Sequence, residues 1–217
     1  MRLLALIESW KEKTFLQVFT IYLRYLIGGA FVMAAFGMGK LDGTSNLLGS
    51  MDHPIQDLQP IQQFFRVMTD SGLYWKFIGW TQIAAGTLLM TQWLARLGVL
   101  IFLGLITNIF VITIAYDFQG TPVVTGLMLL AALYLIVWDV RAFLVLATDR
   151  VIAMKQNLRV HDSGFWAALG CILLVCVLTC GMAKVHPLIQ IGACLAIGFA
   201  GFLYFLLSFN KKLKAGR

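Results

Sequence analysis

Four ionisable residues stand within a few positions of the ends of long apolar stretches: Lys40, Asp42, Lys76 and Asp117. If those stretches are helices ending on one side of a bundle, the four side chains meet at a common rim. Ammonium and carboxylate groups gathered there would suit the polar headgroup of a ligand. Charged residues also anchor helix ends at the membrane surface, so both interpretations stay open.

Two amide residues, Gln82 and Asn108, lie inside the second and third apolar stretches. At the helical rise per residue, each lies roughly 12 Å below the end that carries the rim. Amides at one depth can bond across helices for ~0.6 to 2 kcal/mol, or they can orient a bound ligand. Small residues flank both amides, which predicts that both face the interior of the bundle. These small residues are Gly79, Gly86, Gly104 and Ala115.

A deeper level carries two opposite charges, Arg24 in the first apolar stretch and Asp139 in the fourth. They lie roughly 21 and 25 Å below the rim, level within about one helical turn. A charge inside a bilayer costs at least ~2.5 to 3.5 kcal/mol and normally finds a partner within the bundle. We therefore predict a structural ion pair, with Arg141 as a rival for the carboxylate. The alternative is that Arg24 extends to the headgroups and Asp139 lies at the interface.

The cysteines and histidines do not predict a metal or haem site. The cysteines fall in the last two apolar stretches without a C-x-x-C motif, and the histidines fall between stretches. Packing as small buried residues is the expected role of the thiols. The residues are Cys171, Cys176, Cys180 and Cys194, and His53, His161 and His186.

The composition identifies the medium in which these side chains must be positioned. Hydrophobic residues make up 60% of the 217 residues, charged residues 12%, and the mean hydropathy is +0.84. This predicts an integral membrane protein. Six apolar runs have the length of a bilayer span, and backbone groups in hydrocarbon must bond within their own segment, which predicts an all-α fold. The expected spans are approximately residues 15–38, 74–95, 97–116, 122–147, 164–183 and 187–209.

The basic residues predict the orientation of these spans. With loops assigned alternately to the two sides, twelve of the seventeen lysines and arginines lie on the side of the N-terminus, four lie on the other, and Arg24 is inside a span. The positive-inside rule then places both termini in the cytoplasm. The net charge of +7 thus reflects topology and attraction to anionic lipid, and nucleic-acid binding is not expected.

The chain divides into three expected parts. Residues 1–14 form an interfacial segment at the membrane surface. Residues 15–147 form a four-helix core whose outer loop, 41–72, contains an amphipathic helix capping the bundle. Residues 148–217 form a cytoplasmic linker, a two-helix transmembrane hairpin and a basic tail. The expected apolar face of the cap comprises Ile61, Phe64, Phe65 and Met68.

Four segments of the core resemble the spans of the DoxX-like membrane protein family, the DoxX/DoxD superfamily, over about residues 17–147. They are "RYLIGGAFVMAAFGMGKL", "YWKFIGWTQIAAGTLLM", "ARLGVLIFLGLITNIFVITIAYDF" and "LMLLAALYLIVWDVRAFL". The family includes the DoxD subunit of thiosulfate:quinone oxidoreductase. The particular matches are Arg24, Gly37, Lys40, the Gly79 to Gly86 stretch around Gln82, and Leu97 with Gly98.

The resemblance implies a small bacterial inner-membrane protein linked to thiol, sulfur or quinone redox chemistry and to membrane or periplasmic partner proteins. A quinone is the only cofactor it suggests. The C-terminal hairpin and the longer outer loop depart from the family pattern, so direct transfer of the thiosulfate reaction is in doubt.

Two functions follow as expectations. In the first, the bundle is a redox subunit that binds a quinone headgroup near Gln82 or Asn108, with Lys40 or Lys76 stabilising the reduced anion. In the second, it is a non-catalytic accessory subunit of a larger envelope complex. A transporter is a third and weaker expectation, since no inverted repeat is apparent.

Overall fold

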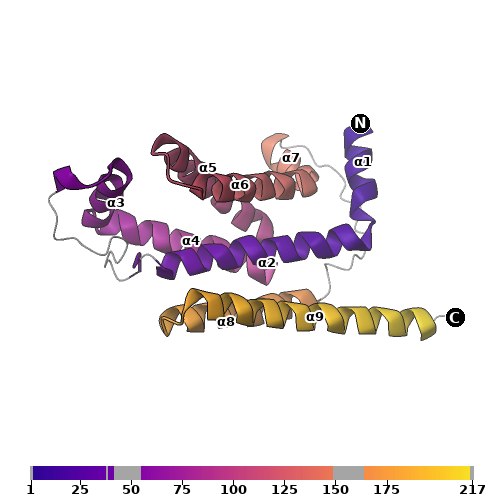
Figure 1. Ribbon diagram of the computed structural model, residues 1–217. Coiled ribbons are helices and arrows are strands. Elements are labelled where there is room, and N and C mark those ends of the chain that lie inside the picture. The colour runs from indigo at the N-terminus through magenta and orange to yellow at the C-terminus, as the bar shows by residue number, and fades with distance from the viewer. Residues whose placement is uncertain (1, 38, 42–54, 149–163, 216–217) are drawn as a thin grey trace.

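We describe the fold from a computed structural model, which describes residues 2–37, 39–41, 55–148 and 164–215. All regular secondary structure within these residues is helical. Six long helices lie side by side (Figure 1). They are α2 (Thr14–Gly37), α4 (Leu73–Thr91), α5 (Ala95–Ala115), α6 (Thr121–Trp138), α8 (Gly164–Met182) and α9 (Pro187–Ala215). The short elements are α1 (Arg2–Lys11), η1 (Ile55–Asp57), α3 (Pro60–Asp70) and α7 (Val140–Thr148).

Five of the long helices, namely α2, α5, α6, α8 and α9, are long and apolar enough to cross a membrane. The chain thus has the helices of a multi-pass, all-helical membrane protein. The remaining expected span corresponds to α4, which is not among the five. Length is not the reason, because α4 has 19 residues and so does α8, which is among the five. The composition of α4 is the reason, because Lys76, Gln82 and several threonines interrupt its apolar residues.

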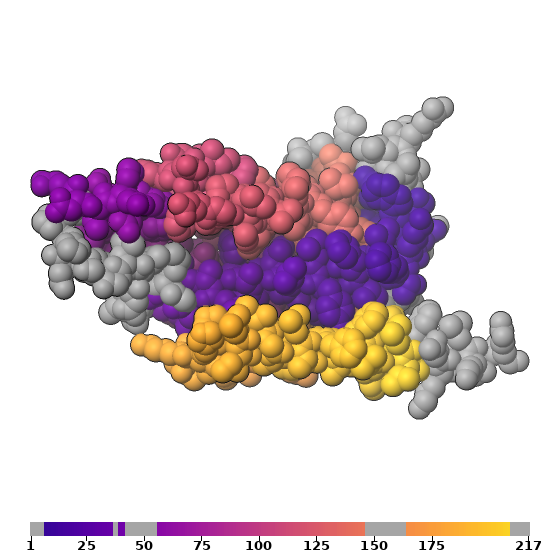
Figure 2. Space-filling view, in the orientation of Figure 1, coloured from indigo at the N-terminus to yellow at the C-terminus, as the bar shows by residue number. Residues whose placement is uncertain are grey.

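The long helices form three layers between two ends of the bundle. Helices α2 and α4 pack together in the middle, α5 and α6 lie on one side, and α8 and α9 lie on the other (Figure 1). Figure 2 shows the hairpin of α8 and α9 lying along α2. We call the end with α1 and the last turns of α9 the near end, and the end with α3 and the turn between α8 and α9 the far end. Helix α1 stands at a steep angle to α2 at the near end (Figure 1).

Glycines set the close contacts between the layers. A Cβ at Gly86 of α4 would lie 2.5 Å from the carbonyl oxygen of Gly28 in α2, and a Cβ at Gly170 of α8 would overlap the carbonyl of Met90 in α4. Small residues allow helix backbones in membranes to approach each other in this way. The prediction that small residues mark the inner faces is correct for Gly79 and Gly86.

The fourth expected span is shorter than predicted, because the helix breaks at Asp139. Helix α6 ends at Trp138, and the carbonyl of Asp139 accepts hydrogen bonds from the amides of Ala142 and Phe143. These bonds begin α7, which leaves α6 in a new direction (Figure 1). Asp139 is therefore at the end of a span rather than inside one.

The predicted amphipathic cap at the far end forms α3. Pro60 occupies its first turn, and the backbone N–H of Gln59 donates to the side chain of Gln62, which satisfies one end of the helix. Ring centroids of Phe65 lie 6.2 Å from Trp75 of α4 and 6.1 Å from Phe118 beyond α5. The cap thus packs on the far ends of α4 and α5 through its aromatic face.

Candidate functional site

The near end of the bundle contains a buried charged cluster. Nη2 of Arg24 lies 2.9 Å from Oδ2 of Asp139, and Nη1 of Arg24 donates to Oε1 of Gln92 at 2.8 Å. The side chains of Arg24 and Asp139 are 7% and 14% exposed. Arg96, half exposed, places its Nε 3.8 Å from Oδ1 of the same carboxylate. The structure thus contains the pair expected from the depths of the two charges.

The expected rival, Arg141, has another partner. Its Nε lies 3.4 Å from Oε1 of Glu8 in α1, which also lies 3.6 Å from Nζ of Lys11. The side-chain amide of Gln17 donates to the carbonyl of Lys11 at 2.6 Å. These contacts attach α1 to α7 and fix the corner between α1 and α2, so Arg141 has a structural role outside the Arg24 cluster.

Gln92, like Arg96, is a member of the cluster that the sequence did not predict. It caps α4 with a φ of 64°, in the left-handed region that costs a residue with a side chain roughly 1 to 2 kcal/mol. Its amide oxygen accepts from Arg24, and its amide nitrogen is buried without a partner among the described residues. The only signal for Gln92 in the sequence was its position. It is a polar residue near the end of the second apolar run, at the side of the membrane where Arg24 lies.

Within the described residues, this cluster carries two guanidinium groups, one carboxylate and one amide. A buried guanidinium held by a carboxylate and an amide oxygen is well suited to fastening three helices together. No nucleophile or free general base lies among its members. We therefore interpret the cluster as a structural clamp joining α2, α4 and the junction of α6 with α7.

The predicted pair of amides is wrong. Gln82 is buried in α4, with its Oε1 unpartnered among the described residues, but Asn108 is exposed on α5. At about 100° per residue, Asn108 lies on the side of the helix away from the buried Phe102 and Ile106. Its flanking residues Gly104 and Ala115 are exposed as well.

Hydroxyl pairs provide the polar links between helices instead. Thr113 of α5 and Thr125 of α6 are buried with their Oγ1 atoms 3.0 Å apart. Thr20 of α2 and Tyr134 of α6 have their oxygens 2.9 Å apart. Threonine and tyrosine are common in membrane helices and carry no charge, so the sequence did not single them out.

The expected rim does not form a shared site among the described residues. Lys40 is 3% exposed, its Nζ donates to the carbonyl of Ala34 at 2.8 Å, and it lies 5.2 Å from the ring centroid of Trp75. Burial lowers the pKa of this ammonium to about 8. Lys76 and Asp117 are exposed, and neither side chain bonds to a described residue. The prediction for Asp42 falls outside the described residues.

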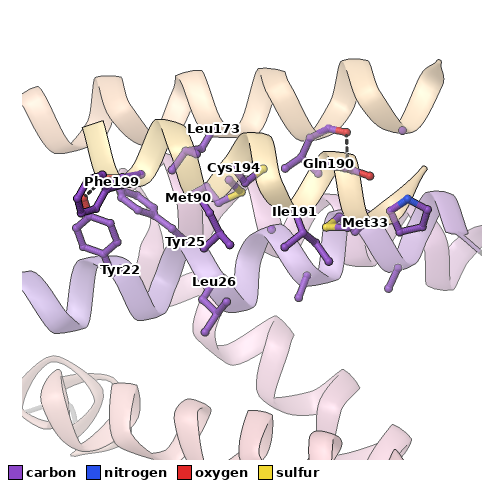
Figure 3. A pocket seen from close by; sticks show the side chains of 18 of the residues that line it. Tyr22, Tyr25, Leu26, Met33, Met90, Leu173, Gln190, Ile191, Cys194 and Phe199 are labelled. Carbon is purple, nitrogen blue, oxygen red and sulfur yellow. Dashed lines mark hydrogen bonds between the residues drawn. The ribbon is translucent and has the colours of Figure 1, made fainter. Parts of the chain in front are cut away.

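A groove of about 1610 Å³ lies between α2 and α9, with α8 and Met90 of α4 at its base (Figure 3). It runs from Thr14 and Leu206 at the near end to Leu41 and Lys184 at the far end. The sequence did not predict it, because it depends on how the hairpin sits against the core. Its labelled lining residues in Figure 3 include Tyr22, Tyr25, Leu26, Met33, Ile191, Cys194 and Phe199.

Thiols and histidines take little part in these sites. The four cysteines are unpaired and half-buried in α8 and α9, and His186 is exposed before α9. No group of three or more metal-ligating side chains gathers within the described residues. The predictions for His53 and His161 fall outside the described residues.

No family model matches this chain, and no curated protein or solved structure matches it either. The DoxX-like resemblance stays a prediction.

Proposed function

We propose that this protein is a non-catalytic accessory subunit of a membrane complex in the bacterial cytoplasmic membrane, built on a DoxX-like core. In this proposal α4 is the sixth span, since it lies lengthwise against α2 and α5. Both termini then lie in the cytoplasm, where the near end carries Arg96, Arg141 and the amphipathic α1. Such a helix, with Trp10 half exposed, suits the membrane surface.

The observation that carries this proposal is the exposure of α9. Only 11% of its membrane window is buried inside the structure, compared with 56% for α2. Large apolar residues are exposed along its length, among them Leu195, Phe199 and Leu203. Since α9 packs mainly on α8, it contributes little to the protein's own core. A span of this kind is suited to packing against another membrane protein.

The residues predicted for a quinone headgroup do not fit one another in space. Asn108 lies on an exposed face of α5, Lys76 is exposed on α4, and Gln82 is buried between helices. This supports the accessory function over the redox function as it was first expected.

Site-specific photo-crosslinking in the native membrane tests the proposal. A photoreactive residue at Leu203 or Leu207, exposed positions of α9 outside the groove, should give one discrete protein adduct in stoichiometric yield. The same residue at Val111, an exposed position of α5, is the matched control and should give none. Absence of adducts from α9, or the same adduct from Val111, would contradict a docking role for α9.

A second candidate, the quinone-linked redox subunit, is favoured by the groove beside α2. Because this groove extends along a whole span, it can hold an isoprenoid tail without a headgroup site at Gln82. Extraction of the purified protein followed by chromatography should then show one quinone per chain. Filling the groove with Ala30→Phe should abolish that quinone, and retention of it would reject this candidate.

A further inference from the structure

Three polar side chains along the groove wall are already bonded within the protein. The hydroxyl of Tyr22 donates to the carbonyl of Gly198 at 2.7 Å, and the hydroxyl of Tyr25 donates to the carbonyl of Trp166. The side-chain amide of Gln190 donates to a carbonyl of α8 at 3.0 Å. With these donors engaged, the wall presents mainly apolar surface (Figure 3). A hydrocarbon chain can therefore lie along it without leaving a buried polar group unpaired.

Among the described residues that line the groove, one is charged, namely Lys184 at the far end. It is exposed, and it forms no ion pair or side-chain hydrogen bond with any described residue. Its backbone has a φ of 52°, in a helix-ending turn where Val185 donates to Cys180 and Lys184 donates to Gly181. Glycine is the usual residue at this position, so the choice of lysine is not explained by the turn itself.

The groove is longer than one leaflet of a bilayer. It follows α2, whose 24 residues span about 36 Å, while the hydrocarbon core of a bilayer is about 30 Å thick. The acyl chain of a phospholipid ends near the midplane, after about 15 Å. Among the residues whose side chains the structure describes, none that lines the groove at the near end is charged, so a second phospholipid from the other leaflet has no headgroup partner among them.

We propose that the groove binds a single lipid with an anionic phosphate head and a polyisoprenoid tail. The phosphate lies at Lys184, and the tail follows α2 and α9 past the midplane towards Leu206. Lys184, the one charged side chain among the described lining residues, selects an anionic head, and the length of the groove selects a tail longer than an acyl chain. A neutral quinone has such a tail but no charge for Lys184 to bind.

Native mass spectrometry of the full chain in detergent micelles tests head and tail separately with three probes. We expect one polyprenyl monophosphate of eleven isoprene units to bind per chain, at least about fivefold more tightly than the polyprenol of equal length. We expect phosphatidylglycerol, which has the charge but shorter chains, to bind more weakly as well. Equal binding of the polyprenol would overturn the role of Lys184, and equal binding of phosphatidylglycerol would overturn the choice of tail.

Matched variants locate the lipid. Lys184→Gln should weaken polyprenyl phosphate binding about fivefold, and Lys76→Gln, an exposed lysine on α4, should leave it unchanged. Ala30→Phe in the groove should weaken both polyprenyl probes, whereas Ala84→Phe on an exposed face of α4 should not. Unchanged binding in both Lys184→Gln and Ala30→Phe, or a dimer that excludes the lipid, would overturn the proposal.

Discussion

Arg24 and Asp139 are 115 positions apart in the chain, yet their side chains form a buried ion pair with 2.9 Å between Nη2 and Oδ2. The pair joins α2 to the break between α6 and α7, and Gln92 brings the end of α4 to the same guanidinium. A buried charge that loses its partner is strongly destabilising, because the remaining ion stays out of water. The near end of the bundle therefore depends on the cluster as a unit.

Replacing either member of the pair should destabilise the protein, and the two losses should not add. We expect Arg24→Ala or Asp139→Ala alone to lower the free energy of unfolding by about 3 kcal/mol. The double variant should lose clearly less than the sum, because it leaves no unpaired charge. Denaturant titration in lipid bicelles measures all four proteins.

The control for this cycle is Arg96→Ala. Arg96 lies 3.8 Å from the same carboxylate but is half exposed, so solvent screens the contact. We expect it to change stability by less than about 1 kcal/mol. Additive losses in the Arg24 and Asp139 variants would show that the two charges do not act as a pair.

Two substitutions of Gln92 should separate the energetic cost of its left-handed backbone from the contribution of its hydrogen bond to Arg24. Gln92→Ala removes the bond to Arg24 and keeps the left-handed backbone, whereas Gln92→Gly removes the bond and relieves the backbone. A hydrogen bond to a charged group contributes about 1.5 to 3 kcal/mol, so the alanine variant should lose about that much. The glycine variant should be more stable than the alanine variant by about 1 kcal/mol in the same titration. Equal stabilities would mean that the left-handed conformation costs nothing here.

The depth of a residue along its helix was enough to predict the Arg24–Asp139 pair. Depth alone failed where contact depends on which side of the helix the residue occupies. Arg24 and Asp139 were paired from their levels alone, because an ionised side chain in a membrane has few places to go. Asn108 was placed at the level of Gln82 by the same method, but α5 is apolar on every side, so its pattern did not reveal which side packs inward. The short amphipathic helix α3 was easier to predict, since its polar and apolar faces differ strongly.

Long-range packing explains what the sequence could not predict. The break at Asp139 interrupts an apolar run that contains neither glycine nor proline at that point. The groove depends on where α9 rests relative to α2, and Tyr22 fixes that position by a bond to Gly198, 176 positions away. Nothing local in either segment indicates that contact.

The crossing of α2 and α4 should tolerate no side chain at Gly86. An alanine there would bring its Cβ to 2.5 Å from the carbonyl oxygen of Gly28 and equally near Val32. Overpacking of this kind typically costs about 1 to 3 kcal/mol, and we expect Gly86→Ala to lower stability by that amount. Gly104→Ala is the matched control, because a Cβ at Gly104 meets nothing within 4 Å. If both variants retain wild-type stability, the helices do not cross as closely as described.

Lys40 should make stability rise with pH above neutrality. Its pKa is lowered by burial to about 8 in the folded protein, from an ordinary value of 10.5. Below about pH 8 the lysine is protonated in both the folded and unfolded chains, so the cost of burying the charge is fully present. Between about pH 8 and 10.5 the unfolded chain binds more protons than the folded one, so the free energy of unfolding increases with pH. Above that range both forms are neutral, and the cost is gone.

The whole gain is on the order of 3 kcal/mol, because each unit of pKa shift corresponds to about 1.4 kcal/mol. Lys40→Met removes the titrating group and keeps a long side chain between Trp75 and Gly79. Its stability should therefore stay level over the range in which the wild-type protein gains. Lys76→Met, at an exposed position of α4, should keep the wild-type pH dependence. A Lys40→Met variant that still gains stability between pH 8 and 10.5 would assign the titration to another group.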